Sequence, residues 1–323
     1  MKETYLIGID VGGTTVKMAV FTIEGQMVDK WSIPTNKAEA GNHIVQDIAV
    51  SADEHLKKAG IDKKDCIAAG IGVPGFIDME HGIIDLAVNV GWKKYPIADK
   101  LSEALGVPAV VDNDANLAAA GEYWQGAGSG ADDVIFLTLG TGVGGGIIIN
   151  GEIIHGTKGM AGEIGHVTVI AEGGAPCNCG KTGCLETVSS ATGMVRLAKD
   201  AAGKNPDSAL TEYLNQGKEL TTKELFEFAA AGDATAQASI HESLHYLGLA
   251  AANIGNVLNP EKFIIGGGVS AAGDSLLQAL RSHFDTYALE RVRDSVEFST
   301  ASLGNDAGVI GAAWLAKKTF SGR

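Results

Sequence analysis

The stretch Asp112-Asn-Asp114 lies where an apolar segment meets a run of helix-forming residues. Residues 107–111 predict a strand, and residues 115–120 predict the beginning of a helix. Asn113 and Asp114 therefore fall at the first positions of that helix, where such side chains often accept backbone N–H groups as caps. A carboxylate at the floor of a cleft could instead accept the proton of a substrate hydroxyl. The local sequence leaves both interpretations open.

Two glycine-rich turns share one pattern, in which a strand leads into a Gly/Thr turn and a second strand follows. One runs from Asp10 to Thr15 and the other from Gly140 to Gly146. Glycine lets the backbone N–H groups of such turns approach a ligand closely, and Asp10 adds a carboxylate. This set suits phosphate oxygens and a magnesium ion. An ordinary hairpin explains either turn alone, but two similar halves facing each other would bring both turns to one cleft, so we interpret them as phosphate-binding.

Residues 140–145 also match the G-x-G-x-x-G pattern of dinucleotide-binding proteins. That pattern needs a helix after the turn, because the pyrophosphate binds at the helix N-terminus. Residues 146–149 predict a strand instead, and we therefore reject the dinucleotide interpretation. A third glycine-rich turn, Gly266 to Gly268, follows a strand predicted at residues 262–265.

One histidine and three of the four cysteines lie close together, at His166, Cys177, Cys179 and Cys184. One imidazole and three thiolates form a set that tetrahedral zinc accepts. The residues between the cysteines are turn formers that let the chain fold around an ion. Because protein side chains fill all four positions, the sequence predicts a structural zinc site and not a catalytic one.

Glu163 and Glu186 flank this cysteine cluster on either side. Either glutamate could be an ordinary solvated surface residue. Since a metal-bound loop would hold both carboxylates in fixed positions, we prefer to interpret them as acceptors for substrate hydroxyl groups.

The predicted elements place these residues at strand ends and helix starts. A buried strand is expected at residues 66–73, and it ends at a turn that begins with Pro74. Ligands of open α/β sheets bind at such carboxyl ends. Helices are expected at residues 42–58, 97–105, 187–202 and 233–257, with a last helix at residues 309–318. Asn89 and Trp92 fall in a loop that could present polar groups to a ligand, although packing is the favoured interpretation for Trp92.

Composition limits the class of protein. A length of 323 residues suggests two domains, and a net charge of −14 argues against nucleic acid as a partner. The N-terminus lacks the pattern of a signal peptide, and no apolar run approaches the roughly 18 residues that cross a membrane. We therefore expect a cytoplasmic protein without membrane contact. In that reducing compartment, clustered cysteines indicate metal binding and not disulfides.

Six motifs in order resemble those of the ROK family, over a span from Tyr5 to about Leu315. They are Asp10-Val-Gly-Gly-Thr, Asp112-Asn-Asp-Ala-Asn, Leu139-Gly-Thr-Gly-Val-Gly-Gly-Gly, Gly162-Glu-Ile-Gly-His, Cys177-Asn-Cys-Gly-Lys-Thr-Gly-Cys-Leu-Glu and Gly266-Gly-Gly-Val. That family contains sugar kinases and some sugar-responsive repressors. The resemblance implies an α/β fold of two actin-like ATPase (ribonuclease H-like) domains with a cleft between them. We expect a small domain at residues 1–112, onto which the C-terminal helix 305–323 packs back, and a large domain at residues 113–304 that contains the zinc loop 166–184.

The resemblance also implies roles for individual positions. Asp114 would be the general base, and Asp10 would act on magnesium through water. Sugar hydroxyls would be held by Asn89, Asn113, Asp114, Glu163, His166 and Glu186, of which His166 would also bind zinc. ATP would be bound by Asp10, Gly12, Gly13, Thr14, Thr141, Gly142, Gly266, Gly267 and Gly268.

The implied activity is the transfer of phosphate from magnesium-ATP to the 6-hydroxyl of glucose, since the resemblance is greatest to the bacterial glucose kinases of the family. Another hexose, such as N-acetylglucosamine, N-acetylmannosamine, mannose or fructose, is the main alternative. A sugar-sensing regulator is less favoured, because the first strand begins at Tyr5 and leaves no room for a helix-turn-helix domain. The family also suggests a homodimer.

Overall fold

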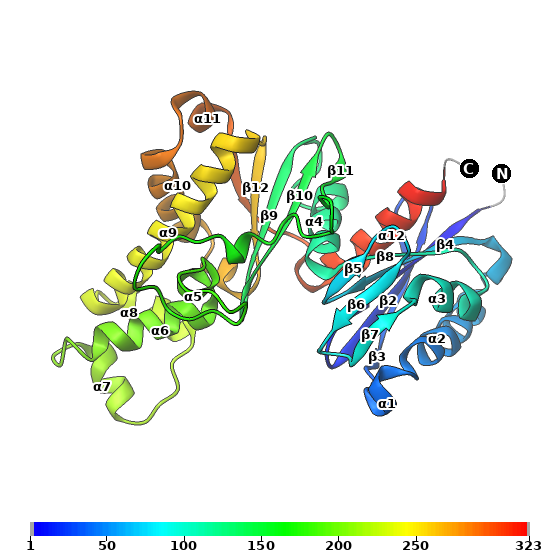
Figure 1. The fold of residues 1–323 in the computed structure, drawn as a ribbon, viewed down its shortest axis with the longest axis horizontal. Coiled ribbons are helices and arrows are strands. Elements are labelled where there is room, and N and C mark those ends of the chain that lie inside the picture. The colour runs from blue at the N-terminus through cyan, green and yellow to red at the C-terminus, as the bar shows by residue number, and fades with distance from the viewer. Residues whose placement is uncertain (1–2, 322–323) are drawn as a thin grey trace. The chain divides into compact units, whose positions relative to one another are not determined.

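The computed structural model describes residues 3–321, which divide into two compact units. Unit 1 comprises residues 3–130, 146–162 and 302–321 of the described chain. Unit 2 comprises residues 131–145 and 163–301. The elements of both units are labelled in Figure 1. Within residues 3–321 the strands form two five-stranded sheets and one three-stranded sheet.

The sheet of unit 1 has the strand order β3-β2-β1-β4-β8. The first three strands are antiparallel neighbours, whereas β4 and β8 run parallel to β1. Successive hydrophobic residues of β1 face opposite sides of this sheet, so both faces must be covered by other elements. The strand bounds are β1 (Tyr5–Val11), β2 (Thr15–Thr22), β3 (Met27–Pro34), β4 (Cys66–Val73) and β8 (Ala109–Asn113).

Helices cover the two faces of this sheet. On one face Ile7 and Ile9 pack in a core with α2 (Ile44–Ala59) and α3 (Ile97–Leu105). On the other face Leu6 packs in a core with Val309 and Ala313 of α12 (Ala307–Phe320). Figure 1 labels α12 beside the strands of this sheet. The smaller elements of unit 1 are α1 (Ala38–Gly41), the 3-10 helices Lys63–Asp65 and Gly304–Asp306, the sheet of β5 (Phe76–Asp78), β6 (Ile83–Ala87) and β7 (Trp92–Tyr95), and the short strand β11 (Glu152–Ile153).

Glycine allows the backbone of α12 to lie directly against the sheet. A Cβ atom on Gly8 of β1 would come within 2.2 Å of the Val309 carbonyl oxygen, and one on Gly70 of β4 within 1.9 Å of the Ala312 oxygen. Real Cβ atoms do not approach a carbonyl oxygen so closely, and interiors are packed at crystal-like density. Any larger residue at these two positions would therefore push the helix away from the sheet.

Helix α4 (Asp114–Gln125) belongs to unit 1, whereas the sequence placed residues 113–304 in the second domain. The physical reason is its close packing against α12. A Cβ on Gly311 would lie 1.8 Å from the Leu117 carbonyl oxygen, and one on Gly121 would lie 2.1 Å from that of Ala307. The first segment of unit 1 therefore continues through α4 to residue 130, beyond the boundary at residue 112 that we expected.

Unit 2 has a parallel core of β9 (Val134–Leu139), β12 (Lys262–Gly266) and β13 (Glu297–Thr300) in the sheet order β11-β10-β9-β12-β13. The boundary between the units falls within β10 (Val143–Ile149). Rings of Phe263, Phe284 and Phe298 meet with centroids 5.0–6.0 Å apart and join the sheet to α10. The helices are α5 (Glu186–Ser189), α6 (Ala191–Ala202), α7 (Ala209–Asn215), α8 (Thr222–Ala230), α9 (Ala234–Leu258), α10 (Asp274–Tyr287) and α11 (Glu290–Ser295), with 3-10 helices at Ile164–His166 and Gly268–Ala272.

Several predicted elements have the expected bounds, such as β4 and α3. The single helix expected at residues 187–202 is instead divided into α5 and α6. The cause is Ser190, whose extended backbone (ψ 166°) stops α5 and whose side chain accepts the Gly193 N–H as the cap of α6. Packing is confirmed for Trp92, which is 1% exposed and donates its indole N–H to the Gly41 oxygen at 3.0 Å.

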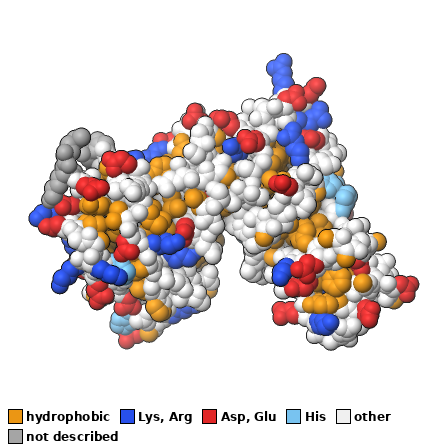
Figure 2. Space-filling view, turned by 180° about the vertical axis from the view of Figure 1, so that it is seen from behind, with side chains coloured by type: hydrophobic (Ala, Val, Ile, Leu, Met, Phe, Trp, Pro, Cys, Tyr) orange, Lys and Arg blue, Asp and Glu red, His pale blue; other side chains and the backbone are white. Residues whose placement is uncertain are grey.

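Acidic and basic side chains are interspersed on the face of the molecule that Figure 2 shows, in keeping with the many charged residues in the sequence. Among the residues that the structure describes, none of the helices has the length and apolar character needed to span a membrane.

We expect Gly311→Ala to destabilise unit 1, because the new methyl group would meet the backbone of Leu117 and not a movable side chain. Overpacking of this kind costs about 1–3 kcal/mol. Urea unfolding followed by circular dichroism measures the change. The control is Gly203→Ala at the end of α6, where the nearest neighbouring atom is 3.7 Å away. An equal effect of both substitutions would contradict the close helix contact.

Candidate functional site

Three parallel strands of unit 1 bring acidic residues to one edge of the sheet. The register sets Asp10 of β1 opposite Gly72 of β4, and Gly72 opposite Asp112 of β8. A Cβ on Gly72 would lie 3.8 Å from the Oδ1 atom of Asp10 and 3.8 Å from the Cα atom of Asp114. Asp10 and Asp114, which are far apart in the sequence, therefore border the same glycine at the carboxyl end of the sheet.

Asn113 is the N-cap of α4, which confirms the capping interpretation for this residue. Its Oδ1 atom accepts the backbone N–H of Ala115 at 2.9 Å and of Asn116 at 3.4 Å, and its Nδ2 donates to the Gly75 oxygen at 3.3 Å. Asp114 is the first residue of the helix and is half-buried. Its Oδ1 atom also accepts the N–H of Ala115 at 2.9 Å. The helix start thus presents one carboxylate and one amide side by side.

The first glycine-rich turn joins β1 to β2, where the Gly12 N–H donates to the Thr15 oxygen at 2.9 Å. Asp10 precedes the turn with its side chain 19% exposed, and Lys17 approaches its Oδ2 atom to 3.7 Å. Burial raises the pKa of the Asp10 carboxyl, and Lys17 opposes this effect. A cation at this position would favour the ionised form further, so Asp10 has the chemistry of a magnesium partner.

Asn89 lies beside this first turn. A Cβ on Gly13 would be 3.7 Å from both the Asn89 Cβ and the Lys37 Nζ. Asn89 and Thr14 are both exposed to solvent. Residues assigned from the sequence to the sugar and to the phosphates therefore meet here within unit 1.

Asp112 and His155 form a polar contact that the sequence did not indicate. The Asp112 side chain is completely buried, and its Oδ2 atom lies 2.6 Å from the His155 Nε2. Its Oδ1 atom accepts the N–H of Asn113 at 2.7 Å and the Nδ2 of Asn116 at 2.9 Å. The hydrogen bond to Asp112 raises the pKa of His155. Asp112 belongs to the Asp112-Asn-Asp114 stretch, but nothing in the sequence pairs it with a histidine so far along the chain.

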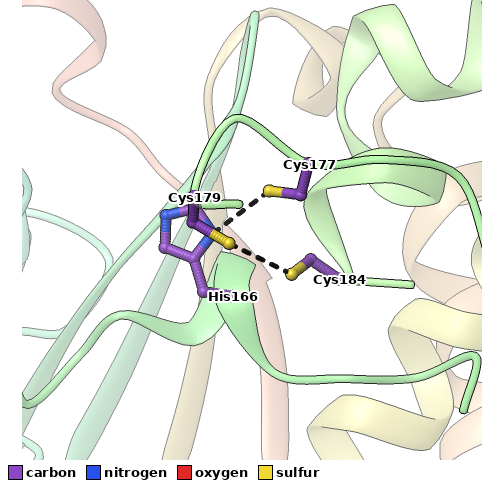
Figure 3. A group of neighbouring side chains, drawn as sticks. All are labelled: His166, Cys177, Cys179 and Cys184. Carbon is purple, nitrogen blue, oxygen red and sulfur yellow. Dashed lines mark hydrogen bonds between the residues drawn. The ribbon is translucent and has the colours of Figure 1, made fainter. Parts of the chain in front are cut away.

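In unit 2 the four predicted zinc ligands converge, as Figure 3 shows. Their ligand atoms all lie within 4.8 Å of one another, with 3.5 Å from the Cys177 Sγ to the His166 Nδ1 and 3.6 Å from the Cys179 Sγ to the Cys184 Sγ. Bonds of about 2.3 Å to sulfur and about 2.0 Å to nitrogen at tetrahedral angles separate donor atoms by roughly 3.5–3.8 Å. The side chains therefore fit a tetrahedral zinc ion.

The thiols of the cluster differ in their surroundings. Burial raises the pKa of Cys184 to about 12, whereas the backbone N–H of Lys181 lowers the pKa of Cys179. A bound metal ion deprotonates a coordinating thiol outright. The set thus has the donors and the spacing for zinc, whose positive charge would offset the cost of the buried thiolate.

The two ring nitrogens of His166 face two different neighbours. Nδ1 faces Cys177, and Nε2 lies 3.9 Å from the Oε2 atom of Glu163. Glu163 is exposed, with 41% of its side chain accessible. With Nδ1 on a metal, the proton of the imidazole would be held at Nε2, on the side of Glu163.

Glu186 connects the cysteine cluster to the second glycine-rich turn. Its Oε2 atom accepts the Val143 N–H at 3.1 Å, and its Oε1 atom lies 3.7 Å from the Cys177 Sγ. A Cβ on Gly142 would be 2.2 Å from Oε2, so a larger residue here would displace the end of the Glu186 side chain. Thr141, at the tip of the turn, is exposed. Residues predicted for the sugar, for zinc and for phosphate are thus neighbours within unit 2.

The second and third glycine-rich turns lie next to each other. Gly267 has a φ of 81°, and a Cβ at this position would be 2.4 Å from the Leu139 oxygen. Leu139 ends β9 immediately before the second turn, so the two turns share the same end of the unit 2 sheet. The turn continues into the strand β10, which begins at Val143, and this confirms our rejection of a dinucleotide fingerprint.

Each unit has a glycine-rich turn at a strand end with an acidic side chain beside it, an arrangement that is consistent with the two-domain actin-like ATPase fold. The model of the ROK family matches residues 6–319, and the chain belongs to this family.

A glucokinase from Halalkalibacterium halodurans is 54% identical over 318 residues, which cover 98% of this chain and 96% of the relative. The structure of a ROK family glucokinase from Streptomyces griseus in complex with glucose and AMPPNP is similar, with 36% identity and a TM-score of 0.76 over 98% of this chain and 100% of that one. A ROK hexokinase from Thermus thermophilus has 31% identity and a TM-score of 0.82, over 98% and 99% of the two chains.

We expect purified protein to contain zinc at one ion per chain, because the four donors fit it. Cys184→Ser should lose the ion and unfold at a lower temperature, since the binding energy of a structural metal contributes to folding. Elemental analysis and thermal unfolding measure both effects. Cys66→Ala is the control, because Cys66 is buried in β4 outside the cluster. Protein purified without chelators that contains no zinc would contradict the site.

We expect His155 to stabilise the fold more at low pH than at high pH. Its pKa is raised in the folded state, so its contribution is complete below the pKa of the unfolded chain, about 6.5, and is lost as the pH rises through the folded value. Urea unfolding of wild type and His155→Gln at pH 5.5 and pH 9 measures this, since glutamine does not titrate. A difference in unfolding free energy that is the same at both pH values would contradict the charged pair.

Proposed function

We propose that the protein transfers the γ-phosphoryl group of ATP to the 6-hydroxyl of glucose, giving glucose 6-phosphate and ADP. The observation that carries this proposal is the 54% identity to a glucokinase along nearly the whole of both chains. The similarity to a glucokinase structure that holds glucose and AMPPNP supports the same substrates. Asp10 and Asp114, to which we assign the central roles, border Gly72 at the carboxyl end of the unit 1 sheet, which supports the proposal.

Asp114 is proposed as the general base. Phosphoryl transfer passes through a loose transition state, so it needs positioning and charge neutralisation more than covalent chemistry. The attacking hydroxyl needs a proton acceptor within hydrogen-bond reach. Asp114 is suited to this role because it begins α4 at the sheet edge where Asp10 also lies, and because it is only half-buried.

The glycine-rich turns are proposed to hold ATP. Their backbone N–H groups can approach phosphate oxygens without side-chain obstruction. Asp10 would hold magnesium through water, and the bound ion would neutralise charge on the phosphates. The phosphate-binding set is Gly12, Gly13, Thr14, Thr141 and Gly142, and the adenosine-binding set is Gly266, Gly267 and Gly268.

The remaining polar residues are proposed to bind the sugar hydroxyls: Asn89, Asn113, Glu163, His166 and Glu186. The zinc ion has a structural role in this proposal, since all four of its ligands are protein side chains. By holding the Nδ1 atom of His166 it would fix the imidazole, whose Nε2–H can then donate to a hydroxyl. Glu186, already bonded to the Val143 N–H, would be held by the same loop.

We also propose that the protein acts in the cytoplasm as a homodimer, as its family resemblance implies. Size-exclusion chromatography with light scattering measures the mass of the particle, and a mass of 33.3 kDa would correspond to a single chain.

The proposal predicts ADP release from magnesium-ATP with glucose, and much slower release with N-acetylglucosamine, N-acetylmannosamine, mannose and fructose. A coupled assay of ADP across this panel measures it. Faster turnover with another hexose would identify that hexose, and not glucose, as the preferred substrate. Binding of sugars without any turnover would instead favour a regulator.

Asp114→Asn provides the test of mechanism. We expect kcat to fall by about 10²–10⁴-fold, because the amide cannot accept the proton, while glucose binding measured by calorimetry is retained. Asp99→Asn is the matched control, since Asp99 also lies in the first turn of a helix of unit 1. Normal turnover by the Asp114 variant would remove this residue from the mechanism.

A further inference from the structure

The carboxylate of Asp112 is the most deeply buried acidic group beside the candidate site. Its side chain has no exposed surface, yet both oxygens have hydrogen-bond partners. A buried charge is costly unless it is paired and hydrogen-bonded. His155 supplies the partner at 2.6 Å, so the imidazole compensates a charge that would otherwise be expensive to bury.

The Oδ1 atom of Asp112 accepts hydrogen bonds from residues on both sides of Asp114. It accepts the backbone N–H of Asn113, which precedes Asp114, and the side-chain amide of Asn116, which follows it in α4. Asn113 in turn caps the helix through the N–H groups of Ala115 and Asn116. The position of Asp114 therefore depends on where the Asp112 carboxylate is held.

His155 holds that carboxylate from a separate part of unit 1. It follows β11, and its own carbonyl oxygen accepts the Ala161 N–H at 3.0 Å, which closes a local turn. Its side chain is 28% exposed, whereas that of Asp112 is fully buried. The imidazole thus ties the turn at residues 155–161 to the strand-to-helix junction.

We propose that His155 is a positioning residue for phosphoryl transfer, which holds Asp114 in place through the hydrogen bond of its Nε2 atom to Asp112. This inference rests on the proposed function of Asp114 as the base. Without the imidazole, Asp112 must recruit water or turn toward another donor, and the N–H of Asn113 and the amide of Asn116 move with it. A displacement of about 1 Å at a reacting group lowers turnover by about 10²-fold.

The test compares His155→Asn with His155→Gln. The amide nitrogen of glutamine is as many bonds from the backbone as the imidazole Nε2, and that of asparagine is one bond short. We expect His155→Asn to lower kcat for glucose phosphorylation by about 100-fold, with the KM values for glucose and ATP changed less than about threefold. His155→Gln should restore kcat to within about fivefold of wild type, because its amide reaches Asp112.

The matched control is His55→Asn. His55 belongs to the same unit and lies 2.7 Å from Asp29 through its Nδ1 atom, with a side chain 25% exposed, but it takes no part in the Asp112 network. We expect this variant to keep the wild-type kcat. Thermal unfolding of all three variants establishes that each is folded at the assay temperature.

A folded His155→Asn variant with a kcat within about twofold of wild type would overturn the inference, as would equal losses in the asparagine and glutamine variants. A loss of kcat that merely equals the fraction of unfolded protein would show that His155 has only a structural role. That result would also overturn the inference. If the wild-type protein phosphorylates no hexose, the proposed function itself fails. That outcome differs from failure of the inference about His155, in which the wild type is active and the variants do not behave as expected.

Discussion

The direct contact between the backbone of α12 and the sheet of unit 1 is the constraint on which the candidate site depends. Carbonyl oxygens of α12 occupy the space where Cβ atoms of Gly8 and Gly70 would be, and α12 in turn touches the backbone of α4 at Gly311. These contacts have no flexible side chains that could absorb an error. The start of α4, and with it Asp114, is therefore fixed relative to the ends of β1 and β4.

At the carboxyl end of this sheet, Asp112 and Asp10 each have a different partner that offsets the cost of burying their charge. Asp112 is buried and has His155 and two amide donors. Asp10 is less buried and has Lys17 at 3.7 Å. A buried group with all its partners satisfied is rigid, whereas a more accessible one can exchange its partner for a ligand. This difference is in keeping with the positioning role proposed for Asp112 and with the ligand-facing roles proposed for Asp10 and Asp114.

In unit 2 the cysteine cluster is connected to both Glu163 and Glu186. His166 directs Nδ1 toward the cysteines and Nε2 toward Glu163, while Glu186 lies between Cys177 and the N–H of Val143. A metal ion that fixes the imidazole therefore also restrains the loop that carries both glutamates. The proposed zinc ligands and the second glycine-rich turn are joined through Glu186, so a bound ion would also restrain the groups proposed to hold the sugar.

The sequence by itself determined the features that depend on local spacing. Helix and strand periodicity gave β4 and α3 their bounds, and the separation of His166 from the cysteines predicted the metal cluster, because turn residues between close ligands leave few other arrangements. The family motifs identified the actin-like fold.

Only the tertiary structure decided which distant residues pair. The partnership of Asp112 with His155, the packing of α4 against α12, and the hydrogen bond from Val143 to Glu186 all join segments that lie far apart in the chain. Such contacts arise because buried polar groups need partners and glycines permit close backbone approach. The sequence alone does not show which residue will partner a given buried polar group, or which backbone will approach a given glycine.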